Sequence, residues 1–350
     1  MKIDNLEIKA KKALYECLNN ISSLNILETE VKPNYGDTQP DYYITLQFQG
    51  KLWTIIAEIK NNGEPRYARQ AANQIRRYYS EIQNNYWVFI APYISLQAAK
   101  ICEREGIGYL DLAGNCHISF ATLYVHIEGR PNPFTRNRYL RSLFSPKAER
   151  ILRVLLTTGP KEWKMEELAS EADVSLGQVS NVKKLLADQD WIDSKTVGFS
   201  LSDPLSLLEE WSQNYKYRRN KVENFYTLLS AAEFEYKLAE VCQIKQLRYG
   251  LTGFSGSARY APAVRYQQVM AYVQNDIDQL AEYLDVKPVD SGPNVLLLRP
   301  YDEGVFYGAE NKDGTIVVSP IQIYLDLSGI RGRGEEAAEI LLDRVIRSTW

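Results

Sequence analysis

Two carboxylates and a lysine in the first third of the sequence are spaced so that they could meet in one site: Asp41, Glu58 and Lys60. Residues 51–60 read as a β-strand, in which residues two apart share a face, so Glu58 and Lys60 project to the same side. Asp41 starts the preceding strand and can reach them. Two carboxylates about 4 Å apart repel by roughly 4 kcal/mol at an effective dielectric near 20, which one lysine cannot cancel. The cluster therefore predicts a Mg²⁺ or Mn²⁺ site, because a divalent ion neutralises both carboxylates and prefers hard oxygen ligands.

A metal ion held at this place would polarise a phosphate and lower the pKa of a bound water. Lys60 would then orient that water or stabilise the developing negative charge. The alternative is that Glu58 and Lys60 form a solvent-facing ion pair on an edge strand, where such a pair contributes little.

The pattern Pro40-Asp41, sixteen residues, then Glu58-x-Lys60 resembles the PD-(D/E)xK nuclease superfamily. Gln74 and Tyr78 have the QxxxY spacing that some branches carry on the helix after this strand, and Glu16 could be the acidic residue often found on the first helix. The resemblance covers about residues 5–120. It implies a metal-dependent phosphodiesterase fold with Asp41 and Glu58 as metal ligands, Lys60 as the catalytic lysine, and supporting roles for the other three.

An alternation of helix and strand signals, typical of an α/β domain, must position these residues. Apolar residues recur at helical spacing over residues 5–19, and Gly50 provides the turn of a hairpin between strands at 42–46 and 51–60. The run at 86–90 is apolar throughout, as in a buried central strand. The remaining predicted elements are helices at 66–83 and 96–105 and strands at 109–112, 117–120 and 123–127.

The segment from 145 to about 201 has the pattern of a winged helix-turn-helix: three short helices and then a small hairpin. Its third helix, 176–186, follows Ser175 as N-cap and keeps polar residues outside its apolar face. Such side chains can contact adenine edges or phosphates in DNA. The predicted DNA-binding residues here are Ser175, Gln178, Asn181, Lys183 and Lys184. A winged helix used for protein contact or dimerisation is the alternative.

The last segment mixes strands at 295–298 and 316–318 with helices that start at Pro204 and Glu335, so it is of the α+β class. With the winged helix before it, it resembles AbiEi-type antitoxins, transcriptional regulators of type IV toxin-antitoxin systems with a domain distantly like nucleotidyltransferases. Gly256-Ser257 fits a nucleotidyltransferase turn, but Asp276 and Asp278 lie where a helix starts, so transferase activity is not expected. Three domains are predicted. Residues 1–135 form a nuclease-like domain with a restriction-endonuclease-like mixed sheet, and residues 136–202 form the winged helix. Residues 203–350 form the AbiEi-like α+β domain.

Charge along the chain favours contact with nucleic acid near the winged helix. The net charge is only −3, yet residues 129–153 hold seven basic residues against one acid. Arg136, Arg138 and Arg141 of this stretch are predicted to contact the DNA backbone. The alternative is a solvated linker.

Composition excludes several classes of protein. Hydrophobic residues are 45% and charged residues 24% of the chain, as in a soluble globular protein, and no run approaches the roughly 18 apolar residues that span a bilayer. Four scattered cysteines form no CxxC pair, so a reducing cytoplasm is expected. The two histidines, His117 and His126, form no motif with a cysteine, and no Cys/His nucleophilic site is predicted.

Taken together, the sequence predicts a cytoplasmic DNA-binding protein with a metal-dependent endonuclease domain, in a setting of phage defence or mobile elements that only the resemblances imply. The alternative function is a winged-helix transcriptional regulator, an antitoxin-like repressor whose nuclease-like domain is catalytically silent. The expected partners are DNA, a second copy of the chain in a homodimer, and a toxin or defence-system protein. No membrane partner is expected.

Overall fold

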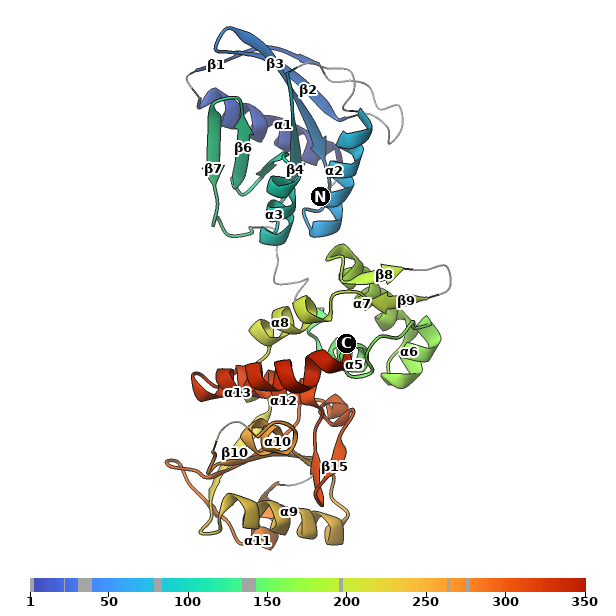
Figure 1. Cartoon of the computed structure of the whole chain (residues 1–350), viewed down its shortest axis with the longest axis vertical. Helices are drawn as coiled ribbons and strands as arrows, with labels where there is room; N and C mark the ends of the chain where they lie inside the picture. Colours follow the sequence, from blue (N-terminus) through green and yellow to red (C-terminus); the bar gives the residue numbers. More distant parts are fainter. Residues whose placement is uncertain are drawn as a thin grey trace. The chain divides into compact units, whose positions relative to one another are not determined.

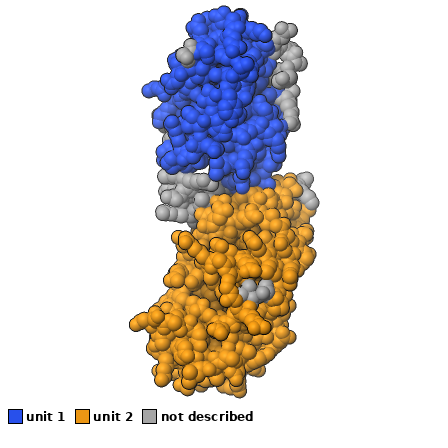
Figure 2. Space-filling view, turned by 60° about the vertical axis from the view of Figure 1, so that its left-hand side comes forward, with its two compact units in different colours: residues 1–138, 187–190 blue, residues 139–186, 191–350 orange. Residues whose placement is uncertain are grey.

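The computed structural model describes residues 3–21, 23–30, 40–78, 84–133, 143–194, 198–262, 265–274 and 277–350. The chain forms two compact units, which Figure 2 shows in different colours. Unit 1 comprises Met1–Arg138 with Ala187–Asp190, and unit 2 comprises Tyr139–Leu186 with Trp191–Trp350. Within the described residues, no helix is both long and apolar enough to cross a membrane.

Unit 1 is built on a mixed sheet whose described strands follow chain order from β1 to β7 (Figure 1). The central pairs, β3 with β4 and β4 with β5, are parallel, and the outer pairs are antiparallel. The strands are β1 (Leu24–Glu30), β2 (Tyr42–Phe48), β3 (Lys51–Ile59), β4 (Asn85–Ala91), β5 (Gly108–Asp111), β6 (Cys116–Phe120) and β7 (Leu123–Ile127). Apart from β1, which the sequence did not predict, these strands confirm the predicted alternation.

Helices cover both faces of this sheet because alternate residues of its central strands are buried on opposite sides. α1 (Ile3–Asn19) packs Ala10, Leu14 and Leu18 on the face that holds Ile55 and Ala57. α2 (Pro65–Tyr78) and α3 (Leu96–Arg104) pack on the other face. The β2–β3 hairpin turns at Gln49 and Gly50, whose φ angles of 48° and 75° suit a tight turn. This turn sets the register of β2 against β3, in which Tyr42 lies opposite Ala57 at the open end of the hairpin.

Unit 2 begins with three helices and a two-stranded hairpin, in the order that the sequence predicts. The elements are α5 (Pro146–Thr157), α6 (Met165–Glu171), α7 (Leu176–Asp188), β8 (Ile192–Ser194) and β9 (Phe199–Leu201). A further backbone pairing joins Trp163 to Phe199, with N–O distances of 2.8 and 3.1 Å. A Cβ on Gly198 would lie 2.7 Å from the Trp163 carbonyl oxygen, so this close approach requires glycine.

The rest of unit 2 is a second mixed sheet with helices on both sides (Figure 1). Among the described residues its strand order is β13-β10-β14-β12-β11-β16-β15. The strands are β10 (Lys221–Tyr226), β11 (Tyr249–Leu251), β12 (Val269–Val273), β13 (Lys287–Pro288), β14 (Val295–Arg299), β15 (Glu310–Lys312) and β16 (Thr315–Val317). The helices are α8 (Pro204–Asn214), α9 (Ala231–Lys245), α10 (Gly253–Tyr260), α11 (Ile277–Leu284), α12 (Pro320–Ser328) and α13 (Arg333–Leu341), which continues as a π-helical turn (Leu342–Ile346).

A buried polar network joins the three helices to this second sheet. Arg153 of α5 is fully buried, and its Nε and Nη2 donate to Oε1 of Gln322 on α12 at 3.0 and 2.8 Å. The guanidinium also lies 3.8 Å from the Glu149 carboxylate and over the Trp211 ring. Gln322 extends the network, because its Nε2 donates hydrogen bonds to the hydroxyls of Tyr215 and Tyr272 and to the carboxylate of Asp326.

Asp326 ends the network in the interior of unit 2. Its carboxylate accepts hydrogen bonds from Thr252, Tyr215 and Tyr272 at 2.5, 3.0 and 2.9 Å. Burial raises the pKa of Asp326 to about 6, and these hydrogen bonds act in the opposite direction. At the other end of the network, Glu149 accepts from Arg219 at 2.9 Å and from the Tyr301 hydroxyl.

Replacing Arg153 should strongly destabilise unit 2, because Gln322 and Glu149 would lose a buried partner. Arg153→Met is expected to lower the free energy of unfolding by about 3–5 kcal/mol. Arg347→Met is the control, since Arg347 pairs with Asp343 on the surface, and it should cost less than about 1 kcal/mol. Urea unfolding of the full chain, followed by circular dichroism, measures both. Equal losses for the two variants would show that the network does not stabilise unit 2.

Candidate functional site

Asp41, Glu58 and Lys60 meet at the end of the β2–β3 hairpin, as the sequence predicts. Tyr42 pairs with Ala57, so extending the register by one residue places Asp41 opposite Glu58. Glu58 is 5% exposed, and its Oε1 lies 2.6 Å from the Lys60 ammonium nitrogen. Oδ2 of Asp41 accepts a hydrogen bond of 2.6 Å from the backbone N–H of Ile59. Glu58 and Lys60 do form an ion pair, but the alternative that this pair faces solvent is wrong, because Glu58 is buried.

Electrostatics at this cluster favour a bound cation. Burial raises the pKa of Glu58, and the charge of Asp41 raises it further, whereas Lys60 lowers it. Burial also raises the pKa of Asp41, against the opposing effects of the Ile59 N–H and Lys60. Both carboxylates are therefore costly to keep ionised, and one lysine cannot neutralise them. The donor set of hard carboxylate oxygens with an excess of negative charge fits Mg²⁺ or Mn²⁺.

Gln74 joins the cluster from α2, because its side chain hydrogen-bonds to Glu58 and lowers the pKa of that carboxyl. The glutamine of the QxxxY pattern is therefore in contact with the Glu58 carboxylate. Tyr78 is the last residue of α2, and its side chain lies outside the described residues.

Glu16 lies elsewhere. Its side chain is 65% exposed and pairs with Lys12 at 3.7 Å along the surface of α1. A different acid of α1, Glu7, acts with Asp41 to raise the pKa of Tyr42, although burial of that tyrosine is the larger cause. Glu7 and Glu16 are nine positions apart, which at about 100° per residue places them on opposite sides of the helix. The sequence analysis missed Glu7, which the helical periodicity could have singled out.

The second candidate site is the outer face of α7. Val179, Val182 and Leu186 are buried, whereas Ser175, Asn181 and Lys184 are exposed and Gln178 is half-buried. The Ser175 hydroxyl accepts a hydrogen bond of 3.3 Å from the Gln178 N–H, as expected of an N-cap. Lys183 is half-buried, with its ammonium 5.1 Å from the centre of the Phe199 ring. The structure therefore gathers the predicted polar side chains of α7 on one helix, with Lys183 turned toward the hairpin.

The basic stretch 129–153 is only partly a free surface. Arg136, Arg138 and Arg141 lie outside the described residues. Arg150 pairs with Asp302 and Asp173 at 2.8 and 2.5 Å, and Arg153 is buried in the polar network. The last two arginines therefore support the fold of unit 2, and counting them toward a DNA-binding surface was wrong.

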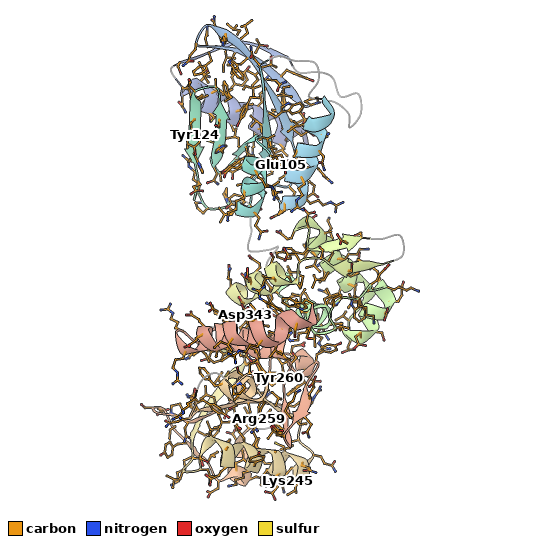
Figure 3. The ribbon with its side chains drawn as sticks, in the orientation of Figure 1. Glu105, Tyr124, Lys245, Arg259, Tyr260 and Asp343 are labelled. Atoms are coloured by element: carbon orange, nitrogen blue, oxygen red, sulfur yellow. The ribbon has the colours of Figure 1, made fainter. Side chains whose placement is uncertain are left out.

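Gly256, Ser257 and Asp278, which the sequence analysis weighed as parts of a nucleotidyltransferase-like site, lie in helices. Gly256-Ser257 lies within α10 and not in a turn, and Asp278 is in the first turn of α11. Asp276 lies outside the described residues. Arg259 of α10, labelled in Figure 3, holds the buried carboxylate of Glu235 at 2.8 Å.

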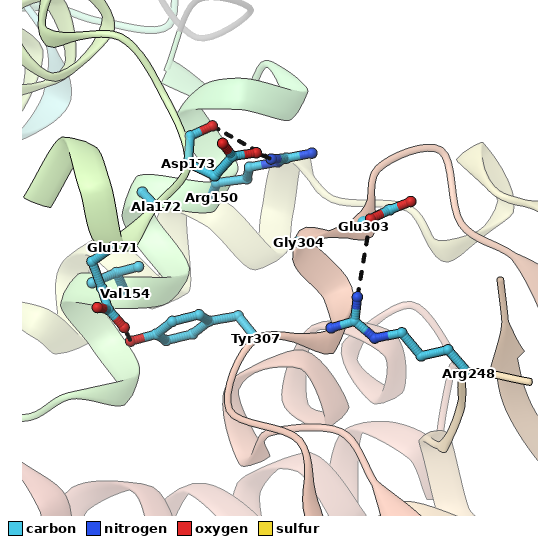
Figure 4. A pocket seen from close by; sticks show the side chains of 9 residues that line it. All are labelled: Arg150, Val154, Glu171, Ala172, Asp173, Arg248, Glu303, Gly304 and Tyr307. Atoms are coloured by element: carbon cyan, nitrogen blue, oxygen red, sulfur yellow. Dashed lines mark hydrogen bonds and ion pairs between the residues drawn. The ribbon is translucent and has the colours of Figure 1, made fainter. Parts of the chain in front are cut away.

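A pocket of about 210 Å³ lies within unit 2, where α5 and α6 approach the segment around Gly304 (Figure 4). Its charged groups are already paired with one another. Tyr307 donates to Glu171 at 2.9 Å, Arg248 lies 4.0 Å from Glu303, and Arg150 contacts Asp173. The Tyr307–Glu171 hydrogen bond and the Arg150–Asp302 ion pair join the three helices to the part that holds the second sheet, so the pocket lies at a contact inside unit 2.

Comparison with known proteins supports an antitoxin-like C-terminal part. Residues 200–347 match the family model described as "Transcriptional regulator, AbiEi antitoxin, Type IV TA system". This part of the chain is similar to that family. A search of curated proteins finds no match.

Two solved structures are distantly similar, "Structure of EndoMS in apo form" and "Structure of EndoMS-dsDNA2 complex". They share 15% and 16% identity with this chain, at TM-scores of 0.22 and 0.20. The matches cover 29% of this chain and 45% and 43% of those chains, less than half of their length. Likenesses at such low TM-scores carry no argument about fold or function.

If Asp41 and Glu58 bind a divalent ion, Mn²⁺ should stabilise the protein. At 100 times its dissociation constant the ion is expected to add about 2.7 kcal/mol to the free energy of unfolding. Asp41→Asn should abolish that gain, whereas Glu16→Gln should keep it because Glu16 pairs with Lys12 at the surface. Thermal unfolding with and without Mn²⁺ measures the effect. An unchanged gain in Asp41→Asn would exclude this carboxylate as a ligand.

Proposed function

We propose that this protein is a DNA-binding transcriptional regulator of the antitoxin type, in which residues 145–201 act as a winged helix. The match of residues 200–347 to a family of antitoxin regulators carries this proposal. The helices that precede the matched part support it, because α7 exposes amide and amine side chains at the spacing of one helical face.

In this proposal α7 enters the major groove of DNA. The side-chain amides of Gln178 and Asn181 are three positions apart and can each make paired hydrogen bonds with an adenine edge. Lys184 lies three positions beyond Asn181, where its ammonium can contact a phosphate. The Ser175 end of α7 adds backbone N–H groups and the positive end of the helix dipole, which favour a phosphate as well. The β8–β9 hairpin would lie along the DNA backbone as the wing.

The buried network attaches the proposed winged helix to the part of the chain that matches the antitoxin family. Arg153 on α5 and Gln322 on α12 are fully buried together, so moving α5 away from α12 would break their two hydrogen bonds and open the buried network. A ligand or partner of the C-terminal part could therefore change how α7 meets DNA. A toxin protein is the proposed partner, and a homodimer would read two half-sites of an operator. This function implies a cytoplasmic location.

Substitutions on α7 test the proposed reader. Asn181→Ala should cost about 1–3 kcal/mol of binding to the specific site and little on unrelated DNA. Lys184→Ala should weaken binding to all sequences and reduce the slope of log affinity against log salt by about 1. Lys245→Ala, on the exposed end of α9, is the control and should bind like the wild type.

Fluorescence anisotropy with duplexes from the DNA upstream of the protein's own gene measures these effects at several salt concentrations. Equal affinities for wild type, Asn181→Ala and Lys184→Ala would contradict the assignment of α7 as the recognition helix.

We propose as a second candidate function that unit 1 is a metal-dependent phosphodiesterase. The convergence of Asp41, Glu58, Lys60 and Gln74 favours it, because a structural ion pair between Glu58 and Lys60 does not need a second, half-buried carboxylate beside it. A bound Mg²⁺ or Mn²⁺ would supply charge neutralisation on a phosphate and a more acidic water. Asp41 and Glu58 would hold the ion, Gln74 would orient Glu58, and the Lys60 ammonium would stabilise negative charge on the reacting phosphate.

Removing Lys60 separates this candidate from a catalytically silent unit 1. Lys60→Ala should lower Mn²⁺-dependent nicking or cleavage of DNA at least a hundredfold while DNA binding stays within twofold, because α7 is unchanged. Lys100→Ala, an exposed residue of α3, is the matched control. Single-stranded, duplex and branched DNA are incubated with and without Mn²⁺. Undiminished cleavage by Lys60→Ala would contradict the proposed catalytic site. If the wild type does not cleave DNA, the phosphodiesterase proposal fails and only the regulator function remains.

A further inference from the structure

Both histidines of the chain lie side by side on one edge of the sheet of unit 1. His117 on β6 pairs directly with His126 on β7, and their ring centres are 5.3 Å apart. Directly opposed residues of an antiparallel pair have side chains on the same face. That face lies opposite the one on which Cys116 and Ile118 pack against α1.

A carboxylate from another element completes the group. Glu103, near the end of α3, places Oε1 3.9 Å from Nδ1 of His117. One possible ligand atom from each of Glu103, His117 and His126 lies within 4.8 Å of the other two. This is the one group of three such side chains that meets this spacing among the residues that the structure describes.

The ring of His117 leaves one metal-binding atom available. Nδ1 of His117 is buried and has no hydrogen-bond partner in the described structure, which is costly for a polar atom unless a ligand occupies it. Burial also lowers the pKa of His117, and this favours the neutral imidazole.

The ring of His126 has a partner for each nitrogen. The Tyr124 hydroxyl lies 3.1 Å from its Nδ1 and the Glu128 carboxylate 3.3 Å from its Nε2. Whichever nitrogen bound a metal, the other would keep a partner that orients the ring, as is usual for metal-bound histidines. Figure 3 labels Tyr124 on β7, at this edge of the sheet.

We propose that Glu103, His117 and His126 bind one Zn²⁺ ion. Two imidazoles and one carboxylate are a donor set that zinc takes with tetrahedral geometry, and the fourth position is left for water or for Glu128. Ligand bonds of about 2.0–2.2 Å place neighbouring ligand atoms about 3.4 Å apart. The observed separations of 3.9 and at most 4.8 Å therefore need only small side-chain rotations.

The chemistry of this site differs from that of the Asp41–Glu58 cluster. Carboxylate oxygens alone suit Mg²⁺ and Mn²⁺, whereas imidazole nitrogens favour zinc and its neighbours in the transition series. An ion here would tie α3 to the β6–β7 hairpin, and β7 is the strand at the edge of the sheet. The bound ion would thus stabilise unit 1 against opening at that edge.

Isothermal titration of the full chain, freed of any histidine tag, with ZnCl₂ tests the proposal. The wild type should bind one equivalent of Zn²⁺, and His126→Ala and Glu103→Gln should each weaken binding at least tenfold. The double variant Asp41→Asn/Glu58→Gln is the control and should bind Zn²⁺ like the wild type. It keeps failure of this site distinct from failure of the proposed nuclease.

Circular dichroism checks that the variants are folded, and X-ray absorption of the zinc-loaded wild type gives a readout that needs no variant. That spectrum should show nitrogen and oxygen neighbours, including two imidazoles, and no sulfur. No zinc binding by the wild type, binding unaffected by both His126→Ala and Glu103→Gln, or a spectrum without imidazole would overturn the proposal.

Discussion

The contact between Arg153 and Gln322 is the constraint on which the arrangement of unit 2 depends. A guanidinium without access to water must have hydrogen-bond acceptors in place, since removing a charge from water costs several kcal/mol. Gln322 provides the acceptor, and its own amide is held by Tyr215, Tyr272 and Asp326. The packing of α5 against α12 must therefore keep these hydrogen-bond partners in place.

This constraint gives a physical reason to treat the proposed DNA reader and the antitoxin-like part as one working body. The family match begins at residue 200, after the three helices, yet these helices, up to Leu186, belong to the same compact unit as the matched residues. The hydrogen bonds from Asp326 through Gln322 to Arg153 connect the interior of this part to α5. Regulation of DNA binding by a partner of the C-terminal part is a consistent extension of that coupling.

The two metal sites proposed for unit 1 differ in their donor atoms. Asp41 and Glu58 are two desolvated carboxylates at the end of a hairpin, next to a lysine. Glu103, His117 and His126 combine imidazole with carboxylate beside β6 and β7, at one edge of the described strand order. The first group is suited to work on phosphates, and the second is suited to hold a structural ion. They can therefore be tested independently by the choice of metal.

Local sequence patterns predict much of the fold and the carboxylate cluster. Strand signals at 42–46 and 51–60 with the Gly50 turn between them were sufficient to place Asp41 beside Glu58 and Lys60, because a hairpin sets its own register. β1 was missed because its sequence, LNILETE, is mostly polar and its exposed Leu27 interrupts the alternation.

Features that depend on distant parts of the chain could not be predicted. Gln322, which accepts the hydrogen bonds of Arg153, lies 169 positions away in the sequence. Without that partner in view, Arg153 was counted as part of a basic surface. The histidine pair is different, because a two-residue turn at Ala121 and Thr122 would have placed His117 opposite His126. That signal comes from hairpin register and not from a metal-binding motif.

Footprinting of the full chain on the DNA upstream of its own gene, in the absence of divalent ions, tests the central claim most directly. The account predicts a discrete protected site that is lost when Gln178 and Asn181 are both replaced by alanine. Protection that survives this double substitution, or no protected site at any salt concentration that permits binding, would contradict a regulator that reads DNA through α7.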